Sequence, residues 1–242
     1  MSSGGTETAR SEVTDRYLET VYYIEHEGEV PRPGRIAEWL GVSPPTVSVS
    51  LQRLARDGWV TIATDRSVHL SDAGRVAAAA AVRRHRLIER WLTDVLGLDW
   101  ATADREAAAL SHGVSEVVLE RLDEHLGRPA TCPHGNVIPG RRAPGGRPMQ
   151  RLLDLPASVE SRVFRISEVA EHDAPQLLAV LHDGGLVPEA RIVVEDRGEG
   201  WLRLVVEGHP VVLSEGVAAA VWVESAPPGG ALASGLPPRR RR

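Results

Sequence analysis

The sequence predicts a mainly α-helical protein with a small β domain, in which a winged helix-turn-helix module precedes a helical domain and a β-barrel. Two observations carry this prediction. Apolar residues recur at helical spacing from Thr14 to about Gly127, interrupted by one β-hairpin. From about Val159 to Glu224, short runs of β-forming residues alternate with Gly, Pro and Asp. Between these blocks, residues 128–150 are rich in proline and glycine, which is typical of a linker.

Length and composition limit the class of protein. The chain has 242 residues, of which 42% are hydrophobic and 25% charged, close to the average for globular proteins. Its longest apolar run, Val76–Val82, is too short to span a membrane, and residues 1–10 lack the apolar core of a secretory signal. A single cysteine, Cys132, cannot form an internal disulfide, so we expect a cytoplasmic protein without a membrane partner. The net charge of −5 still leaves room for a small DNA-reading face.

The first helical block shows the pattern of a helix-turn-helix. An amphipathic helix spans Asp15–Glu27. A short helix, Arg35–Leu40, ends at Gly41, which suits a left-handed C-terminal cap. Ser43 is placed to cap the next helix, Pro44–Asp57, because Ser is a preferred N-cap and Pro is tolerated in the first turn. The inward positions of this second helix are Val47, Leu51 and Leu54.

A β-hairpin follows directly and forms a wing, with strands Trp59–Ala63 and Ser67–Leu70 around the turn Thr64–Arg66. The order helix, turn, helix, wing is typical of DNA-binding modules; the alternative is a helical hairpin whose arginines are only solvated. Short hydrogen-bonding or methyl-bearing side chains suit the major groove, and arginines suit phosphates. We therefore expect base contacts from Ser43, Pro45, Thr46, Ser48 and Val49, and phosphate contacts from Arg35, Arg53, Arg56 and Arg66.

Two longer helices are predicted next, over Asp72–Leu96 and from Ala101 or Thr102 to Leu126. Small residues at Ala107–Ala109 would permit close approach of another helix, and we expect the second helix to form a two-fold dimer contact. Its apolar face consists of Leu110, Val114, Val117, Val118, Leu122 and Leu126.

Side chains on these two helices form a candidate divalent-metal site. His85 and Glu89 are four residues apart and leave their helix on one face, which suits two metal ligands. Asp104 and His112, eight residues apart, share a face of the next helix. The alternative is a solvated ion-pair face, because His and Glu among arginines are common on helix surfaces.

The last block predicts a small barrel of about five strands. The β-forming runs are bounded by Gly, Pro and Asp. They are Arg162–Ile166, Ala190–Val194, Trp201–Val206, Val211–Leu213 and Ala220–Glu224.

Seven short stretches carry a resemblance to a known family: Tyr17–Leu18, Ser43–Arg56, Leu70–Gly74, His85–Glu89, Gly97–Trp100, His112–Ser115 and Pro133–Gly140. In these stretches, and in their order, the chain resembles the diphtheria toxin repressor (DtxR) family of iron- and manganese-dependent repressors. The resemblance implies a homodimeric, metal-activated repressor that binds a palindromic operator on double-stranded DNA near metal-uptake genes. Val49 stands where iron-type recognition helices commonly have glutamine, so we expect a different operator.

Combined with the residue patterns, the resemblance gives a division into domains. Residues 11–74 form the winged helix-turn-helix domain, and residues 75–140 the helical dimerisation and metal-binding domain. Residues 141–158 form a linker to an SH3-like (FeoA-like) domain at 159–224. Residues 1–10 and 225–242 are expected to be disordered tails.

The family's ancillary metal site carries over in part. His85 and Glu89 fall on two of its ligands, and Asp104 stands where iron-type members have a histidine. A barrel ligand is assigned to Glu171, with Asp173 and Gln176 as alternatives. The resemblance implies Mn²⁺ or Fe²⁺ as the physiological ion, and Zn²⁺ or Co²⁺ would also bind in vitro.

The family's primary metal site is altered. His112 falls on its histidine, and Glu19 matches an acidic ligand of the manganese-type members. Arg16, Ala108 and Ser111 replace the other ligands. One hypothesis is that Arg16 acts as a built-in cation. Its guanidinium would reach Glu19, Ser111 or His112 and hold the first helix against the helix that bears His112, so that DNA binding is largely independent of metal. The alternative is that Arg16 is solvated and metal acts through the ancillary site alone.

An enzyme is not expected. Ser111 beside His112 is the one adjacent pair of nucleophile and base, and neighbours in a helix do not face each other. Cys132 and His134 fall in a turn that the family keeps and are interpreted as linker residues.

Overall fold

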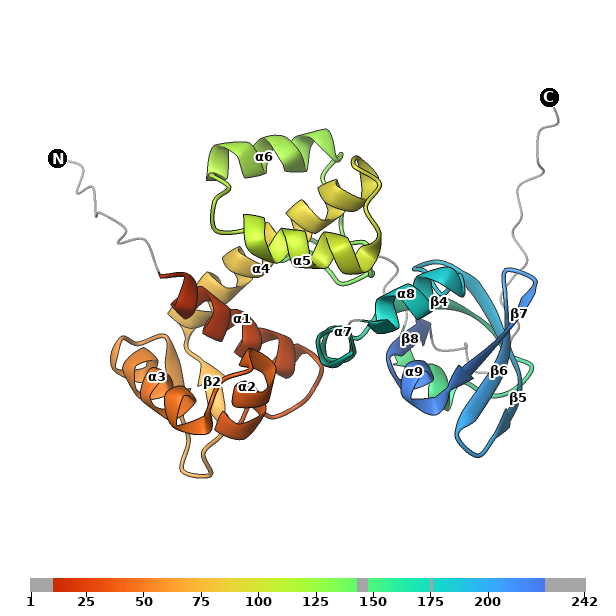
Figure 1. The fold of residues 1–242 in the computed structure, drawn as a ribbon, viewed down its shortest axis with the longest axis horizontal. Coiled ribbons are helices and arrows are strands. Elements are labelled where there is room, and N and C mark those ends of the chain that lie inside the picture. Colours follow the sequence, from red (N-terminus) through yellow and green to blue (C-terminus); the bar gives the residue numbers. More distant parts are fainter. Residues whose placement is uncertain (1–10, 143–147, 175, 225–242) are drawn as a thin grey trace. The chain divides into compact units, whose positions relative to one another are not determined.

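The computed structural model describes residues 11–142, 148–174 and 176–224, apart from the side chains of residues 170, 171 and 173. The chain divides into two compact units (Figure 1), and each is described by itself. The first contains the described residues up to 133 together with 137–142. The second contains residues 134–136 and the described residues from 148 onward. No helix in these ranges is long and apolar enough to cross a membrane.

The first unit begins with the helices α1 (Glu12–His26), α2 (Pro33–Leu40) and α3 (Pro44–Arg56). Their ends are determined locally. Gly41 ends α2 with a φ of +64°, and the Ser43 side chain accepts a hydrogen bond from the Thr46 N–H at the start of α3. The predicted helix-turn-helix and both of its caps are confirmed.

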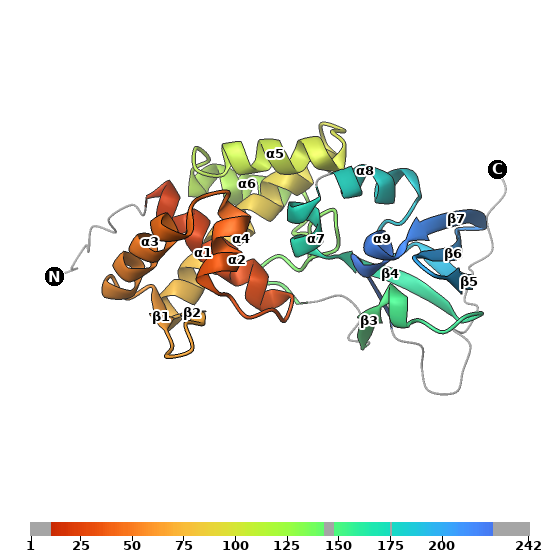
Figure 2. The ribbon, with the colours of Figure 1, turned by 60° about the horizontal axis from the view of Figure 1, so that its bottom comes forward.

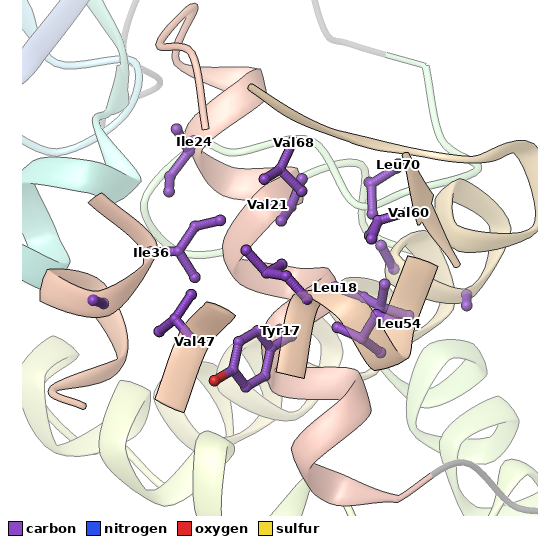
Figure 3. Close-up of a cluster of buried hydrophobic side chains, with 14 residues drawn as sticks. Tyr17, Leu18, Val21, Ile24, Ile36, Val47, Leu54, Val60, Val68 and Leu70 are labelled. Carbon is purple, nitrogen blue, oxygen red and sulfur yellow. The ribbon is translucent and has the colours of Figure 1, made fainter. Parts of the chain in front are cut away.

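An apolar core joins these helices to the hairpin that follows. Val47, Leu51 and Leu54 are buried, as predicted for the inward face of α3. Figure 3 shows Leu18 and Val21 of α1 lying between Ile36 and Val47 on one side and the hairpin residues Val60 and Leu70 on the other, with Leu54 of α3 on the hairpin side. The labelled core residues are Tyr17, Leu18, Val21, Ile24, Ile36, Val47, Leu54, Val60, Val68 and Leu70.

The hairpin consists of β1 (Val60–Ile62) and β2 (Val68–Leu70), paired antiparallel with Val60 opposite Leu70. Asp65 shapes its turn, because the carboxylate accepts hydrogen bonds from the Ser67 N–H at 3.0 Å and the Ser67 hydroxyl at 2.7 Å. These hydrogen bonds hold the pKa of Asp65 below its ordinary value. Arg66, next in the turn, has a φ of +67°. The predicted wing is therefore present, and Figure 2 shows β1 and β2 side by side in it.

Helix α4 (Asp72–Asp94) begins directly after the wing. The Ser71 side chain caps it by accepting a hydrogen bond from the Gly74 N–H at 3.0 Å, and the same hydroxyl donates to the Gly58 carbonyl oxygen at 2.6 Å. Gly74 lies so close to the wing that a Cβ there would be 1.9 Å from the Trp59 carbonyl oxygen. Glycine is therefore required at this junction, where α4 packs tightly on the wing.

The prediction of one helix from residue 101 or 102 to Leu126 is wrong. The structure has two helices, α5 (Trp100–Leu110) and α6 (Glu116–His125). The Gly113 N–H bonds back to the Leu110 carbonyl oxygen at 2.9 Å in the intervening turn, and the Ser115 side chain caps α6. A local N-cap thus starts a new helix that the apolar spacing alone did not reveal.

Both helices pack on α4. Ala107 is fully buried in this core, so the expectation that it approaches a second copy is wrong, whereas Ala108 and Ala109 are exposed. Ion pairs add to the α4–α6 contact, since Arg83 binds the buried Asp123 at 2.7 Å. The core residues are Leu87, Ile88, Leu92, Ala103, Ala107, Leu119 and Ile138.

The second unit is an antiparallel sheet of six strands in the order β3-β8-β4-β5-β6-β7. Breaks in register within β4 and β5 mark irregularities of the kind that bend a sheet. The strands are β3 (Met149–Arg151), β4 (Glu160–Ile166), β5 (Arg191–Gly198), β6 (Trp201–Val206), β7 (His209–Ser214) and β8 (Val221–Glu224). Helical segments η1 (Leu152–Asp154), α7 (Glu168–Asp173), α8 (Gln176–Asp183) and α9 (Glu215–Ala219) connect them.

The linker prediction for residues 141–158 is wrong over 149–154. Met149–Arg151 pairs with β8, and Leu152 and Leu155 are fully buried, so this segment belongs to the β domain. Residues 134–136 also join this unit. Gly135 has a φ of +87°, and the Asn136 side chain donates to the Ile166 carbonyl oxygen at 3.1 Å. The predicted tails, 1–10 and 225–242, lie outside the described residues.

Candidate functional site

Three of the predicted metal ligands come together between α4 and α5. His85 and Glu89 lie one turn apart on α4, and Asp104 faces them from α5. Their candidate ligand atoms all lie within 4.8 Å of one another, and His85 Nε2 is 3.2 Å from Asp104 Oδ1. Asp99 positions Asp104 by capping α5 through the Thr102 N–H at 3.0 Å. We call His85, Glu89 and Asp104 the α4–α5 cluster.

The cluster is partly buried, and its charges are strongly coupled. Glu89 is only 2% exposed. Burial alone would lower the pKa of His85, but the hydrogen bond to Asp104 and the negative charges of Glu89, Asp104 and Glu19 outweigh it and raise the pKa to about 9. At neutral pH the ring is therefore an imidazolium surrounded by carboxylates.

Glu19 of α1 faces the same cluster. Burial is the main reason that the pKa of its carboxyl is raised to about 7; the positive charge of His85 opposes this rise, and the nearby Asp15 adds to it. This interaction was not expected from the ancillary-site ligands, because Glu19 matched the other metal site of the family. A carboxyl group from α1 thus lies in the electrostatic field of the α4–α5 cluster.

The donor set fits a divalent transition metal. One imidazole nitrogen and carboxylate oxygens are ligands that Mn²⁺, Fe²⁺ and Zn²⁺ accept, and the His85 proton would have to leave first. The buried Glu89 and the half-exposed Asp104 already stabilise the positive charge of a protonated histidine, so positive charge is favoured at this position. The residues present are therefore suited to the ion that the resemblance implies.

The second predicted metal centre is not assembled among the described residues. His112 is exposed and follows the end of α5, so it no longer shares a helix face with Asp104 as predicted. Ser111 is buried, and its hydroxyl donates to the Ala107 carbonyl oxygen at 2.6 Å. Ala108 carries no ligand atom and is exposed.

Arg16 does not bridge helices as the built-in-cation hypothesis requires. It is exposed on α1, while Tyr17 and Leu18 occupy the buried face. Within residues 11–142, its guanidinium has no hydrogen bond to Glu19, Ser111 or His112, and of the positive charges that lower the pKa of Glu19 it has a smaller effect than His85 and Arg84. The cation that does lie among the carboxylates is the protonated His85.

The predicted ligand from the β domain stays a prediction. The side chains of Glu171 and of the alternative Asp173 lie outside the described residues, and the alternative Gln176 is exposed at the start of α8.

The outward face of α3 carries the predicted DNA-contacting residues. Pro45, Thr46, Arg53 and Arg56 are exposed, and Val49 is 70% exposed. The hydroxyls are partly engaged within the helix, since Ser48 donates to the Pro44 carbonyl oxygen at 3.0 Å and the Ser43 and Thr46 hydroxyls are 2.8 Å apart.

Arg35 and Arg66 lie around one cavity of about 630 Å³ beside the wing. Arg35 is paired with Glu29 at 3.3 Å and with Glu38 at 3.8 Å. The wing turn is also fixed to this region, because Arg32 donates to the Asp65 carbonyl oxygen at 2.8 Å. The cavity gathers arginines at the edge of the module that carries α3.

An aromatic stack that sequence reasoning missed connects α4 to this region. The Arg86 guanidinium lies 5.8 Å from the Tyr23 ring centre, Tyr23 stacks on Trp39 at 5.9 Å, and Arg35 lies 5.5 Å from Trp39. The four side chains come from three helices and were not linked by spacing. Arg86 follows His85 in sequence, so the stack runs from beside the α4–α5 cluster to a predicted phosphate-binding arginine.

The surface of α5 and α6 retains exposed apolar residues after both helices have packed on α4. Leu110, Val117 and Val118 are 40%, 75% and 48% exposed. Together with the exposed Ala108 and Ala109 they form what we call the α5–α6 patch.

Sequence profiles of three domain families match the chain in succession. Residues 10–68 match the N-terminal DNA binding domain of iron dependent repressors, and residues 71–140 match their metal binding and dimerisation domain. Residues 150–225 match the FeoA domain. The last match begins at β3 and agrees with its place in the second unit.

Individual proteins match over most of their length. The iron-dependent repressor IdeR of Mycobacterium tuberculosis is 41% identical over 224 residues, which cover 88% of this chain and 97% of that protein. The diphtheria toxin repressor of Corynebacterium diphtheriae is 35% identical over 223 residues, with the same coverage of 88% and 97%. A solved manganese-dependent transcriptional repressor in complex with manganese has a TM-score of 0.76 at 34% identity and covers 88% of this chain and 100% of its own.

Proposed function

The chain belongs to the diphtheria toxin repressor family of iron- and manganese-dependent repressors, and on this premise we propose that it is a homodimeric, metal-dependent transcriptional regulator. Its relatives are repressors and not enzymes. Because the proposed target is a DNA operator, we place its action in the cytoplasm. Mn²⁺ or Fe²⁺ is the proposed activating ion.

The α4–α5 cluster is the observation that carries this proposal. It lies on α4, the helix that begins at the wing, and it gathers a histidine and two carboxylates at ligand distance. A bound divalent cation would supply positive charge where the carboxylates of Glu89, Asp104 and Glu19 converge. His85 would bind as the neutral imidazole and release its proton, while Glu89 and Asp104 would bind through carboxylate oxygens.

Glu19 provides a physical link between the α4–α5 cluster and the helices that would contact DNA. It belongs to α1, which packs on the hairpin and on α2 through the core around Leu18 and Val21. A carboxylate attracted to the cluster therefore biases the placement of α1 relative to α4, and α3 follows through the shared core. Arg53, Arg56, Arg35 and Arg66 would then contact phosphates on either side of the groove that α3 enters.

The α5–α6 patch is the proposed dimer contact. A palindromic operator requires a two-fold protein, and an isologous interface uses the same patch on both copies. Val117 and Val118 are the exposed side chains that such an interface would bury.

A gel shift on the gene's own upstream region tests this function. We expect binding with Mn²⁺ or Fe²⁺ and loss of binding in EDTA. His85→Ala should lose metal-dependent binding, whereas Arg16→Ala should keep it. Equal binding by the wild type with and without EDTA would contradict metal dependence, and no binding under either condition would contradict the choice of operator region.

A further inference from the structure

We propose that Val49 determines operator specificity by contacting the 5-methyl group of a thymine in the major groove. This inference rests on the proposed function, because it requires that α3 enters the groove. DNA binding alone does not require any particular contact between one side chain and one base, whereas a contact between Val49 and a thymine methyl group is specific.

The position of Val49 is the first argument. It is 70% exposed on α3, opposite the buried Val47, Leu51 and Leu54. Pro45, one turn before it, and Arg53, one turn after it, are exposed on the same face. A single exposed valine is ordinary on a protein surface. This one lies between a proline and a predicted phosphate-binding arginine on the helix that faces DNA.

The neighbouring hydroxyls provide the second argument. The one donor proton of Ser48 goes to the Pro44 carbonyl oxygen at 3.0 Å. Ser43 and Thr46 share a hydroxyl–hydroxyl bond of 2.8 Å, and Ser43 also accepts from the Thr46 N–H at 3.3 Å. These bonds keep the helix start intact and leave few free donors for base edges. One of the three hydroxyl protons stays free, and the hydroxyl oxygens can still accept from bases, so the exposed carbons of Pro45 and Val49 are the remaining groups on this face that can contact a base.

The third argument is what an aliphatic side chain can distinguish. Valine neither donates nor accepts hydrogen bonds, so it cannot read the edges of adenine, guanine or cytosine. Thymine is distinguished in the major groove by its 5-methyl group, which an apolar side chain contacts favourably. Uracil has the same pairing edge and the same O4 acceptor but lacks this methyl group. A thymine-to-uracil change therefore isolates the contact.

The test begins with an operator obtained from the protein itself. Duplexes are selected from a random library by the full chain with Mn²⁺, and each thymine of the selected site is replaced by uracil in turn. We expect one thymine per half-site where uracil weakens wild-type binding about fourfold, the value of burying one methyl group. In Val49→Ala the penalty at this thymine should disappear, while penalties at other thymines remain.

Val76→Ala is the matched control, because Val76 is 73% exposed on α4 and lies outside α3. It should keep the wild-type uracil profile. Each profile compares the affinities of different duplexes for one protein. A smaller folded fraction would lower all of these affinities equally, so it cannot produce the expected change in the profile. Identical profiles for the wild type and Val49→Ala would overturn the inference and leave DNA binding intact. Failure to select any site would instead contradict the proposed function.

Discussion

The helix-turn-helix region and the α4–α6 region of the first unit differ in how deeply they bury charged side chains. The core of the former is apolar, with Leu18, Ile36 and Val47 at zero exposure. Charged side chains are buried in both regions, but more deeply in the latter, where Arg86 is 2% exposed, Glu89 2% and Asp123 1%, than in the former, where Asp15 is 6% and Glu27 9% exposed. Apolar burial does not depend on pH or ions, whereas buried charges depend on their partners and on protonation. We therefore expect pH and metal ions to act mainly on the α4–α6 region.

Truncating the helix-turn-helix core should have the largest effect. Leu51→Ala removes a side chain that is 1% exposed between α3 and its neighbours. We expect the free energy of unfolding to fall by about 2–5 kcal/mol, because the transfer energy is lost and a cavity remains. Urea unfolding followed by circular dichroism measures it. The metal affinity of the folded fraction should not change, and a large change there would show that the two regions are not separable.

The pH dependence of metal binding should be the next largest effect. His85 must lose a proton, and its pKa is raised to about 9, so Mn²⁺ affinity should rise about tenfold per pH unit between pH 7 and 8.5. Titration calorimetry in buffers of different ionisation enthalpy measures both the affinity and the released proton. An affinity independent of pH would contradict the role of His85.

His85 and Glu19 also determine whether the stability of the metal-free protein rises or falls with pH. The pKa of His85 and that of Glu19 are both raised by folding, to about 9 and about 7. The folded state then binds more protons than the unfolded state. The free energy of unfolding should therefore fall as pH rises, from 4.5 through 7 because of Glu19 and from 6.5 through 9 because of His85. Thermal melts of the metal-free protein at several pH values would show this decline. Saturating Mn²⁺ should remove or reverse it.

Removing one helix cap should have the smallest effect. Ser43→Ala takes away the side chain that accepts from the Thr46 N–H, and we expect a loss of about 1 kcal/mol in unfolding free energy. Ser43→Asp retains an acceptor and should recover most of the stability. A loss of metal affinity in Ser43→Ala would show that the end of α3 communicates with the α4–α5 cluster.

The difference between the regions also explains what could be predicted from the sequence. Gly41 and Ser43 act on backbone groups within a few residues, so local chemistry was sufficient to place α2 and α3. His85 and Glu89 could be paired because helical spacing places them on one face. The break between α5 and α6 was missed, because the apolar spacing continued across it.

Long-range contacts could not be predicted in the same way. Glu19 acts on His85 across a helix packing that spacing does not encode. Spacing also left open whether Arg16 bridges two helices or is solvated, and the structure places it on the exposed face of α1. The stack of Arg86, Tyr23 and Trp39 depends on three helices meeting. β3 was taken for linker because proline and glycine surround it, although it pairs with a strand more than 70 residues later.

The tight contact at Gly74 connects the start of α4 to the wing, so a tilt of this helix would displace the wing. Because no side chain fits between α4 and the Trp59 carbonyl oxygen, the wing follows any movement at the start of the helix. Asp72 and Glu89 are separated by about 26 Å of helix at 1.5 Å per residue. A tilt of about 5° around the cluster end would therefore displace the wing by roughly 2 Å, more than the few tenths of an ångström that a hydrogen bond tolerates. A small displacement at His85 and Glu89 would thus become a larger displacement of Arg66, because the tight contact at Gly74 makes the wing move with α4.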